Sequence, residues 1–156
     1  MDRVTVGWRE WVSLPDLGVS TIKAKVDTGA RSSSLHAYHL REFERDGRHM
    51  VRFTIHPIQR DSRTTIEAEV ELADRRVVRN PGGGGREEVR PVIVTTIEIA
   101  GKRWPIELTL TPRDTMGFRM LLGRQAIRRR FVIDPGRSFL TRRLDQPGSR
   151  RDEAGS

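Results

Sequence analysis

The sequence predicts an all-β protein, a small β-barrel with one short helix near its C-terminal end. Short runs in which apolar and polar residues alternate, typical of half-buried strands, recur along the chain and are separated by turn residues. One stretch, residues 123–130, has the pattern of an amphipathic helix, with Ala126 and Ile127 on its apolar face. Many strands and a single late helix therefore favour a small barrel.

In the first half of the chain, residues 5–12 are expected to form the opening strand and the Pro-Asp-Leu-Gly sequence at 15–18 a turn. Apolar residues then alternate with lysines in a strand that ends at Asp27. Residues 50–56 and 65–72 carry apolar side chains at every second position. This period of two predicts strands with one face toward the core.

In the second half, residues 92–99 and 104–110 flank Ala-Gly-Lys-Arg at 100–103, which predicts a hairpin. Residues 120–122 are continuously apolar, as expected of a short strand buried on both faces. The remaining expected strands are residues 131–133 and 138–140, on either side of an Asp-Pro-Gly turn.

Length and composition favour one soluble domain in a reducing compartment. A chain of 156 residues suits a single domain, and the lack of cysteine excludes disulfides and thiolate metal sites. We expect the domain to span residues 1–141 and the polar residues 142–156 to form a disordered tail. No signal peptide and no apolar run of about 20 residues are present, so we expect a cytoplasmic protein without a membrane partner.

The formal net charge is +8, from 29 Lys and Arg against 21 Asp and Glu. The arginines are scattered and often neighbour acidic residues, and stacking aromatics or a reading helix are not visible. A solvated basic surface is therefore favoured over a nucleic-acid site, while attraction to an acidic partner agrees with the charge.

The Asp27-Thr28-Gly29-Ala30 sequence is the most informative motif. It follows an alternating strand and offers a carboxylate, a hydroxyl, backbone N–H groups and a position without a Cβ. Such a turn can hold an acid rigidly and hydrogen-bond its charged form, which makes Asp27 a candidate catalyst. Taken alone, the motif could also be an ordinary turn.

Two signatures in this order resemble those of a known family. Asp27-Thr28-Gly29-Ala30 resembles the active-site motif of aspartic peptidases, and Leu121-Leu122-Gly123-Arg124 resembles the second motif of retropepsin-like domains. The glycine-rich residues 81–85 and the strands that follow resemble the flap, strand, turn and strand of retroviral proteases. The resemblance, over about residues 4–140, implies a retropepsin-like closed β-barrel. Residues 23–31, 113–124 and 131–136 resemble more closely the bacterial RimK/LysX-associated family, whose members have been labelled ATP-dependent zinc proteases.

The resemblance implies an aspartic endopeptidase. Aspartic proteolysis uses two carboxylates that share one proton, one activating a water molecule and the other polarising the scissile carbonyl. Because the chain carries one Asp-Thr-Gly motif, the second acid should come from another copy in a homodimer. Asp27, Thr28 and Gly29 are the expected catalytic residues. The expected substrate-binding residues are Ala30, Leu122 and the flap glycines Gly82, Gly83, Gly84 and Gly85.

No cofactor or metal is expected. The glycines lead into Arg86 and Glu87 and not into Lys-Ser or Lys-Thr, so they do not form a P-loop for ATP. His36 and His39 lack a His-Glu-x-x-His context and are better explained as surface or turn histidines than as zinc ligands. The serines at 32–34 have no positioned base, and packing or turn hydrogen bonds account for them.

The sequence departs from the viral pattern at one ion pair. In retroviral proteases an acid after the catalytic motif pairs with the arginine after the glycine motif, but Arg31 occupies that place here. Arg124 must therefore have another partner, for which Glu10, Asp114 and Asp134 are open candidates. The longer spacing between the two motifs is expected to lie in an insertion at residues 36–61.

A second function stays open beside the peptidase. The same barrel could bind acidic or glutamate-rich peptides without cleaving them, in association with RimK-type ligases. Cleavage specificity and the natural substrate do not follow from the sequence.

Overall fold

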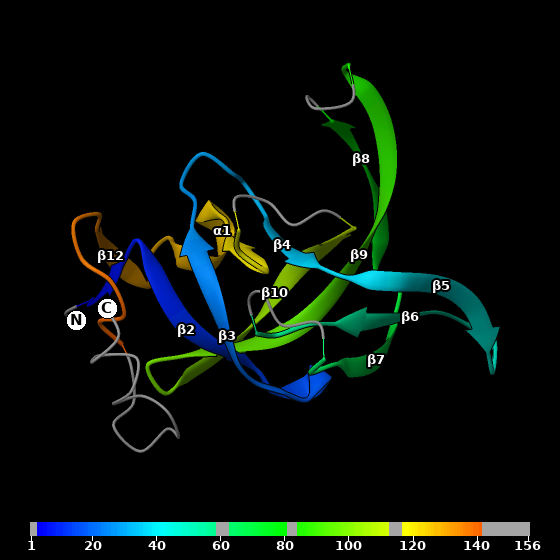
Figure 1. The fold of residues 1–156 in the computed structure, drawn as a ribbon, viewed down its shortest axis with the longest axis horizontal. Coiled ribbons are helices and arrows are strands. Elements are labelled where there is room, and N and C mark those ends of the chain that lie inside the picture. The colour runs from blue at the N-terminus through cyan, green and yellow to red at the C-terminus, as the bar shows by residue number, and fades with distance from the viewer. Residues whose placement is uncertain (1–2, 59–62, 81–83, 113–116, 142–156) are drawn as a thin grey trace.

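The computed structural model describes residues 3–58, 63–80, 84–112 and 117–141 (Figure 1). Strands dominate this part of the chain, with one 3₁₀ turn (η1) and one short helix (α1). In chain order the elements are β1 (Val4–Gly7), β2 (Arg9–Leu14), η1 (Pro15–Leu17), β3 (Val19–Val26), β4 (Ser33–His36), β5 (Tyr38–Arg45), β6 (Arg48–Ile55), β7 (Ile66–Glu71), β8 (Asp74–Asn80), β9 (Arg86–Ile99), β10 (Lys102–Thr111), β11 (Met120–Leu122), α1 (Arg124–Ile127) and β12 (Phe131–Asp134).

The main sheet closes on itself. Its strands follow the order β10-β4-β11-β3-β2-β9, and β9 pairs again with β10, which completes a ring of hydrogen-bonded strands. β2 and β9 meet through Ser13 and Glu98. β8 continues the sheet beyond β9 as an edge strand. The predicted all-β class is confirmed, and the ring provides the closure that the retropepsin-like fold requires.

Two smaller sheets accompany the ring. β1 pairs in parallel with β12, and β5, β6 and β7 form an antiparallel sheet. In Figure 1 the β8–β9 hairpin projects away from the ring, and the β5–β6–β7 sheet lies beside the base of that hairpin. The stretch at residues 36–61, expected to hold an insertion, contains β5 and β6.

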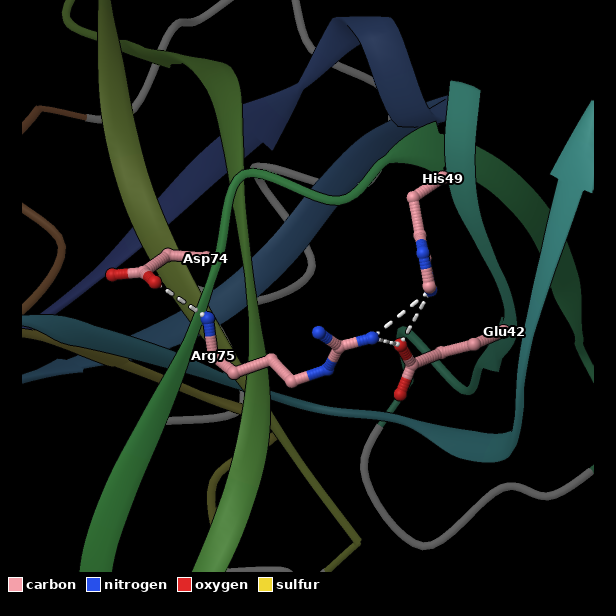
Figure 2. Close-up of polar contacts among 4 residues, drawn as sticks. All are labelled: Glu42, His49, Asp74 and Arg75. Carbon is pink, nitrogen blue, oxygen red and sulfur yellow. Dashed lines mark hydrogen bonds and ion pairs between the residues drawn. The ribbon is translucent and has the colours of Figure 1, made fainter. Parts of the chain in front are cut away.

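Arg75 links the projecting hairpin to the β5–β6–β7 sheet (Figure 2). Its Nη2 donates to Oε1 of Glu42 at 2.6 Å, and His49 Nε2 lies 2.9 Å from the same oxygen. Burial raises the pKa of Glu42, but the hydrogen bonds from Arg75 and His49 outweigh it, so this pKa lies below its usual value. The backbone N–H of Arg75 also donates to Asp74 Oδ1. These contacts tie β8 to a separate sheet at the base of the hairpin.

The predicted opening strand is wrong in one respect, because residues 5–12 belong to two strands. The strand is interrupted at Trp8, whose N–H donates to the carbonyl oxygen of Arg137 at 2.9 Å. A Cβ on Gly7 would lie 2.2 Å from the same carbonyl oxygen, so only glycine fits where these segments cross. β1 is thereby directed to β12, while β2 pairs with β3.

The C-terminal segment also differs from its prediction. Residues 138–140 form no strand, although the N–H of Phe139 donates to the carbonyl oxygen of Arg9. The helix expected at 123–130 is shortened to α1, with Ala126 and Ile127 buried as predicted. No helix in the described part of the chain is long and apolar enough to cross a membrane. The tail expected at residues 142–156 lies outside the described residues.

Sequence periodicity missed β4, β5 and β8. β4 is short, and β5 and β8 are rich in charged residues with little buried surface. The β5–β6 hairpin turns through Asp46 and Gly47, with φ of 55° and 77°, the left-handed values of a tight two-residue turn. The predicted β9–β10 hairpin is confirmed, with its turn at Ala100 and Gly101.

One apolar core joins the ring to the β5–β6–β7 sheet. Val51, Phe53 and Ile55 of β6 point inward as predicted and are fully buried. Burial of a side chain of this size contributes about 1.5–3 kcal/mol. Other fully buried members come from the ring, namely Leu14, Ile22, Leu35, Ile93, Ile97, Leu108, Leu110 and Leu122.

Candidate active site

The Asp27 turn leaves the end of β3 beside β11. The N–H of Asp27 donates to the carbonyl oxygen of Leu122 at 2.8 Å, and the N–H of Val26 donates to that of Trp8. The carbonyl oxygen of Asp27 accepts from the N–H of Ala30 at 3.2 Å, which closes the turn. The backbone around the carboxylate is therefore held by β11 on one side and by Trp8, between β1 and β2, on the other.

The Asp27 side chain is half-buried and folds back onto its own turn. Its Oδ1 accepts a hydrogen bond from the N–H of Gly29 at 3.0 Å. A Cβ on Gly29 would lie 3.2 Å from that oxygen, a tight contact that glycine avoids. Thr28 and Gly29 are exposed and Ala30 is half-buried. The structure thus brings together residues 27–30, as the motif predicted.

Gly123 packs against the backbone that follows the Asp27 turn. A Cβ at this position would lie 2.4 Å from the carbonyl oxygen of Ser32 and 2.5 Å from its carbonyl carbon. These are backbone atoms that cannot swing away, so a side chain at residue 123 would push the segment after Asp27 out of place. The Gly123 N–H also donates to Ser33 Oγ at 3.1 Å. The second motif therefore requires glycine for close backbone packing.

The first residues of α1 complete the support. The N–H of Arg124 donates to the carbonyl oxygen of Ala30 at 2.8 Å, and that of Gln125 to the carbonyl oxygen of Arg31 at 3.0 Å. These donors lie in the first turn of the helix, where no intrahelical acceptor exists. The carbonyl groups of Ala30 and Arg31 thereby satisfy these two helical N–H groups, and the same hydrogen bonds hold the Asp27 segment in place.

Arg124 has a backbone partner where a carboxylate was expected. Its Nη1 donates to the carbonyl oxygen of Thr28 at 2.8 Å. Of the three candidates, Glu10 and Asp134 accept bonds from other groups, and Asp114 lies outside the described residues. The guanidinium therefore holds the backbone of the Asp27 turn directly.

Leu122 lies in the core. Its side chain has no exposed surface in the single chain, so there it lines no substrate site. Its expected contact with substrate is thus corrected to a positioning role, through the carbonyl oxygen that holds Asp27.

The glycine-rich sequence at 81–85 lies between β8 and β9 in the chain. Asn80 pairs with Arg86 at the last rung of their ladder, and the flap itself stays a prediction. Gly84 and Gly85 are exposed and have φ of 75° and 81°. Gly82 and Gly83 lie outside the described residues.

A cavity that sequence reasoning missed adjoins the segment after Asp27. It has a volume of about 230 Å³ and is lined by Arg31, Ser32, Arg76, Glu107 and Gln125. A second cavity of about 330 Å³ shares Glu107 and Gln125 and extends toward α1 and β10. These residues come from four separate segments, so no local pattern in the sequence could have grouped them.

Glu10 has a structural role that the sequence did not predict. It is fully buried, and its carboxylate accepts from the N–H groups of Gly7, Leu140 and Thr141 and from Thr141 Oγ1, at 2.6–3.1 Å. It therefore fastens the C-terminal segment to β2. Strand alternation would have found it, because Glu10 shares the inward face with Val12 and Leu14.

Of the two histidines expected at the surface or in turns, His36 differs from the expectation and His39 agrees with it. His36 is neither a surface nor a turn residue: it ends β4, is 4% exposed, and contacts the carbonyl oxygen of Pro112 and the Arg119 guanidinium. His39 is exposed, and His49 joins the Glu42–Arg75 contact described above. Within the described residues, no group of three or more His, Asp or Glu side chains is arranged to hold a metal ion.

The closed ring of strands, the Asp-Thr-Gly turn and the close packing of Gly123 beside that turn define a retropepsin-like protein. A family model described as "Retropepsin-like aspartic endopeptidase RimB" matches residues 5–144, and the chain belongs to this RimB-like family. The suspected relationship is thereby confirmed.

Two curated relatives of the chain are much longer than it. The chain is 47% identical over 130 residues to a probable alpha-L-glutamate ligase of Desulfotalea psychrophila, covering 83% of this chain and 28% of the relative. It is 44% identical over 138 residues to one of Shewanella pealeana, covering 88% and 30%. The chain therefore spans less than a third of these curated relatives.

A solved structure has the same fold. It is the crystal structure of a protein of unknown function from Legionella pneumophila, with a TM-score of 0.73 and 32% sequence identity, covering 90% of this chain and 100% of that one.

Proposed function

We propose that the chain is the subunit of a homodimeric aspartic endopeptidase, in which each copy supplies one Asp27. The observation that supports this proposal best is the fixation of the Asp27 turn, which Leu122, Arg124 and Gln125 hold through backbone hydrogen bonds. A catalytic acid must keep its position while charge moves, and groups held by such a framework are preorganised.

The proposed chemistry needs two copies of this turn. Two facing Asp27 carboxylates share one proton because both cannot easily carry charge at short range. The charged carboxylate takes a proton from a water molecule while the water oxygen attacks the peptide carbonyl carbon. The protonated carboxyl group donates a hydrogen bond to the carbonyl oxygen. Thr28 would bond across the two-fold axis, and Gly29 would let the two backbones approach closely.

We propose that the substrate is a glutamate-rich peptide. The relatives are named probable alpha-L-glutamate ligases, and the net charge of +8 favours an acidic partner. The β8–β9 hairpin is proposed to close over the extended peptide as a flap, and the reaction to take place in the cytoplasm.

Replacement of Asp27 by Asn tests the proposal. Asp27→Asn keeps the size of the side chain and an oxygen that can accept from Gly29, so the fold should persist while cleavage of oligoglutamate peptides is lost. Cleavage by this variant at the wild-type rate would contradict the assignment. Binding of the same peptides by both proteins without any cleavage would favour the non-catalytic alternative.

Mixing the two proteins tests the shared site. Excess Asp27→Asn subunit should draw wild-type subunits into mixed dimers with one native acid and so depress wild-type cleavage. A surface variant far from the turn, Glu44→Gln, serves as the control and should not depress it. Formation of mixed dimers that retain full activity per wild-type subunit would show that each chain works alone.

A further inference from the structure

We propose that Arg76 of β8 and Arg31 form a subsite for a substrate carboxylate next to the Asp27 turn, and that Glu107 limits its affinity. The inference rests on the proposed peptidase function and assigns its specificity for acidic side chains to named residues. Arg76 is the central residue because it reaches from the projecting hairpin to the segment that follows Asp27.

The position of Arg76 is set by two contacts. Its Nη1 donates to Ser32 Oγ at 3.3 Å, and its Nη2 donates to Glu107 Oε1 at 3.2 Å. Ser32 belongs to the segment held by Gly123, five residues after Asp27. A group bound by Arg76 would therefore lie alongside the catalytic turn.

The cavity at this place carries an excess of positive charge. Its charged lining residues are two arginines, Arg31 and Arg76, and one glutamate, Glu107. Arg31 takes part in no ion pair within the described part of the chain. An anion entering the cavity would therefore meet a net charge of +1, and guanidinium groups bind carboxylates with two parallel hydrogen bonds.

The volume suits one side chain. At about 230 Å³ the cavity is smaller than the roughly 300–1,000 Å³ pockets that hold drug-sized ligands. Its lining is polar, with Ser32 and Gln125 completing the set of hydrogen-bonding groups. A single glutamate side chain of an extended peptide fits within this volume and is complementary in charge.

Glu107 competes for the same guanidinium. Its side chain is 42% exposed and that of Arg76 32% exposed, so solvent screens the pair and its contribution is small. The change Glu107→Gln removes the negative charge yet keeps an oxygen that can accept from Arg76. The variant should therefore leave Arg76 in place and raise the positive charge of the cavity.

β5 offers a control outside the hairpin that is proposed as the flap. Arg41 lies on this strand, and its side chain is exposed. Arg41→Gln and Arg76→Gln each remove one positive charge. General attraction of an acidic peptide would respond equally to both, whereas a subsite would respond only to Arg76.

The test measures binding in the Asp27→Asn background, with dye-labelled pentaglutamate and pentaglutamine peptides and fluorescence anisotropy. Arg76→Gln should weaken pentaglutamate binding about ten-fold, the range expected for a hydrogen bond to a charged group. Arg41→Gln should change it less than about two-fold, and Glu107→Gln should strengthen it about three-fold. Binding of pentaglutamine should respond to none of them.

Equal losses in the two arginine variants, or weaker binding after Glu107→Gln, would overturn the subsite. The same variants carrying Asp27 separate this inference from the peptidase proposal. Cleavage that does not depend on Arg76 would contradict the subsite alone. Arg76-dependent binding without cleavage by the native protein would support the subsite and contradict the peptidase.

Discussion

Gly123 packs against the backbone of Ser32 so closely that a Cβ on the glycine would lie 2.4 Å from the serine carbonyl oxygen. This contact joins the strand of the second motif to the segment that follows Asp27. Since the contact is with backbone atoms, the position of the segment after Asp27 depends on the absence of a side chain at residue 123.

Gly123→Ala should therefore destabilise the protein and abolish cleavage together. Forcing a methyl group into a packed site costs about 1–3 kcal/mol, and this contact involves backbone on both sides. Urea unfolding followed by tryptophan fluorescence measures the loss. Gly136→Ala is the control, because a Cβ there would make an ordinary 3.5 Å contact with Asp134 Oδ1. Equal stability of the two variants would refute the steric explanation.

Arg124→Met should reduce activity more than stability. The variant loses the hydrogen bond to the carbonyl oxygen of Thr28 on an exposed surface, worth about 0.5–1.5 kcal/mol. Because the same bond holds the motif that we propose to be catalytic, kcat for a glutamate peptide should fall about ten-fold or more. Arg128→Met, one helical turn later and also exposed, should leave kcat unchanged. A similar fall in both variants would point to lost charge and not to lost positioning.

Glu10→Gln should lower the free energy of unfolding by about 2 kcal/mol. The amide places an N–H₂ group opposite donors from Gly7, Leu140 and Thr141, so buried N–H groups lose their acceptor. Chemical denaturation gives the difference, and the exposed Glu44→Gln provides the baseline. A change as small as that of Glu44→Gln would mean that the C-terminal segment does not depend on this carboxylate.

Glu69 should contribute stability that depends on pH. Hydrogen bonds from Arg52 and then Arg45, at 2.9 and 2.7 Å, lower its pKa below 4.5. Because the folded pKa lies below the unfolded one, this contribution is present above about pH 4.5 and disappears as the pH falls through the folded value.

Glu69→Gln should therefore lower the Tm slightly at neutral pH, and the difference should vanish in acid. Thermal unfolding followed by circular dichroism at several pH values measures it, with Glu71→Gln, 3.9 Å from Arg48, as the control. A difference that grows as the pH falls would have the wrong sign for the ion pairs and would reject them as its source.

Much of the fold followed from local patterns. Alternation located β3, β6 and β10 because one face of each strand is buried in the core. The same rule places Glu10 inside, and the Asp46-Gly47 sequence indicates the tight turn that was missed. β8 was not predictable in this way, since it is an edge strand that pairs with β9 and buries little surface.

The candidate site likewise has features that local sequence patterns predicted and features that they did not. The motif at residues 27–30 and the glycine at 123 are contiguous sequences whose chemistry is local, so the sequence alone identified them as a turn that holds an acid and the glycine strand beside it. The partner of Arg124, the buried position of Leu122 and the charged cavity at Arg76 were decided only by the tertiary structure. The physical reason is distance along the chain: Arg124 meets Thr28 across 96 residues and Arg76 meets Ser32 across 44. Such pairs form only when the ring of strands closes.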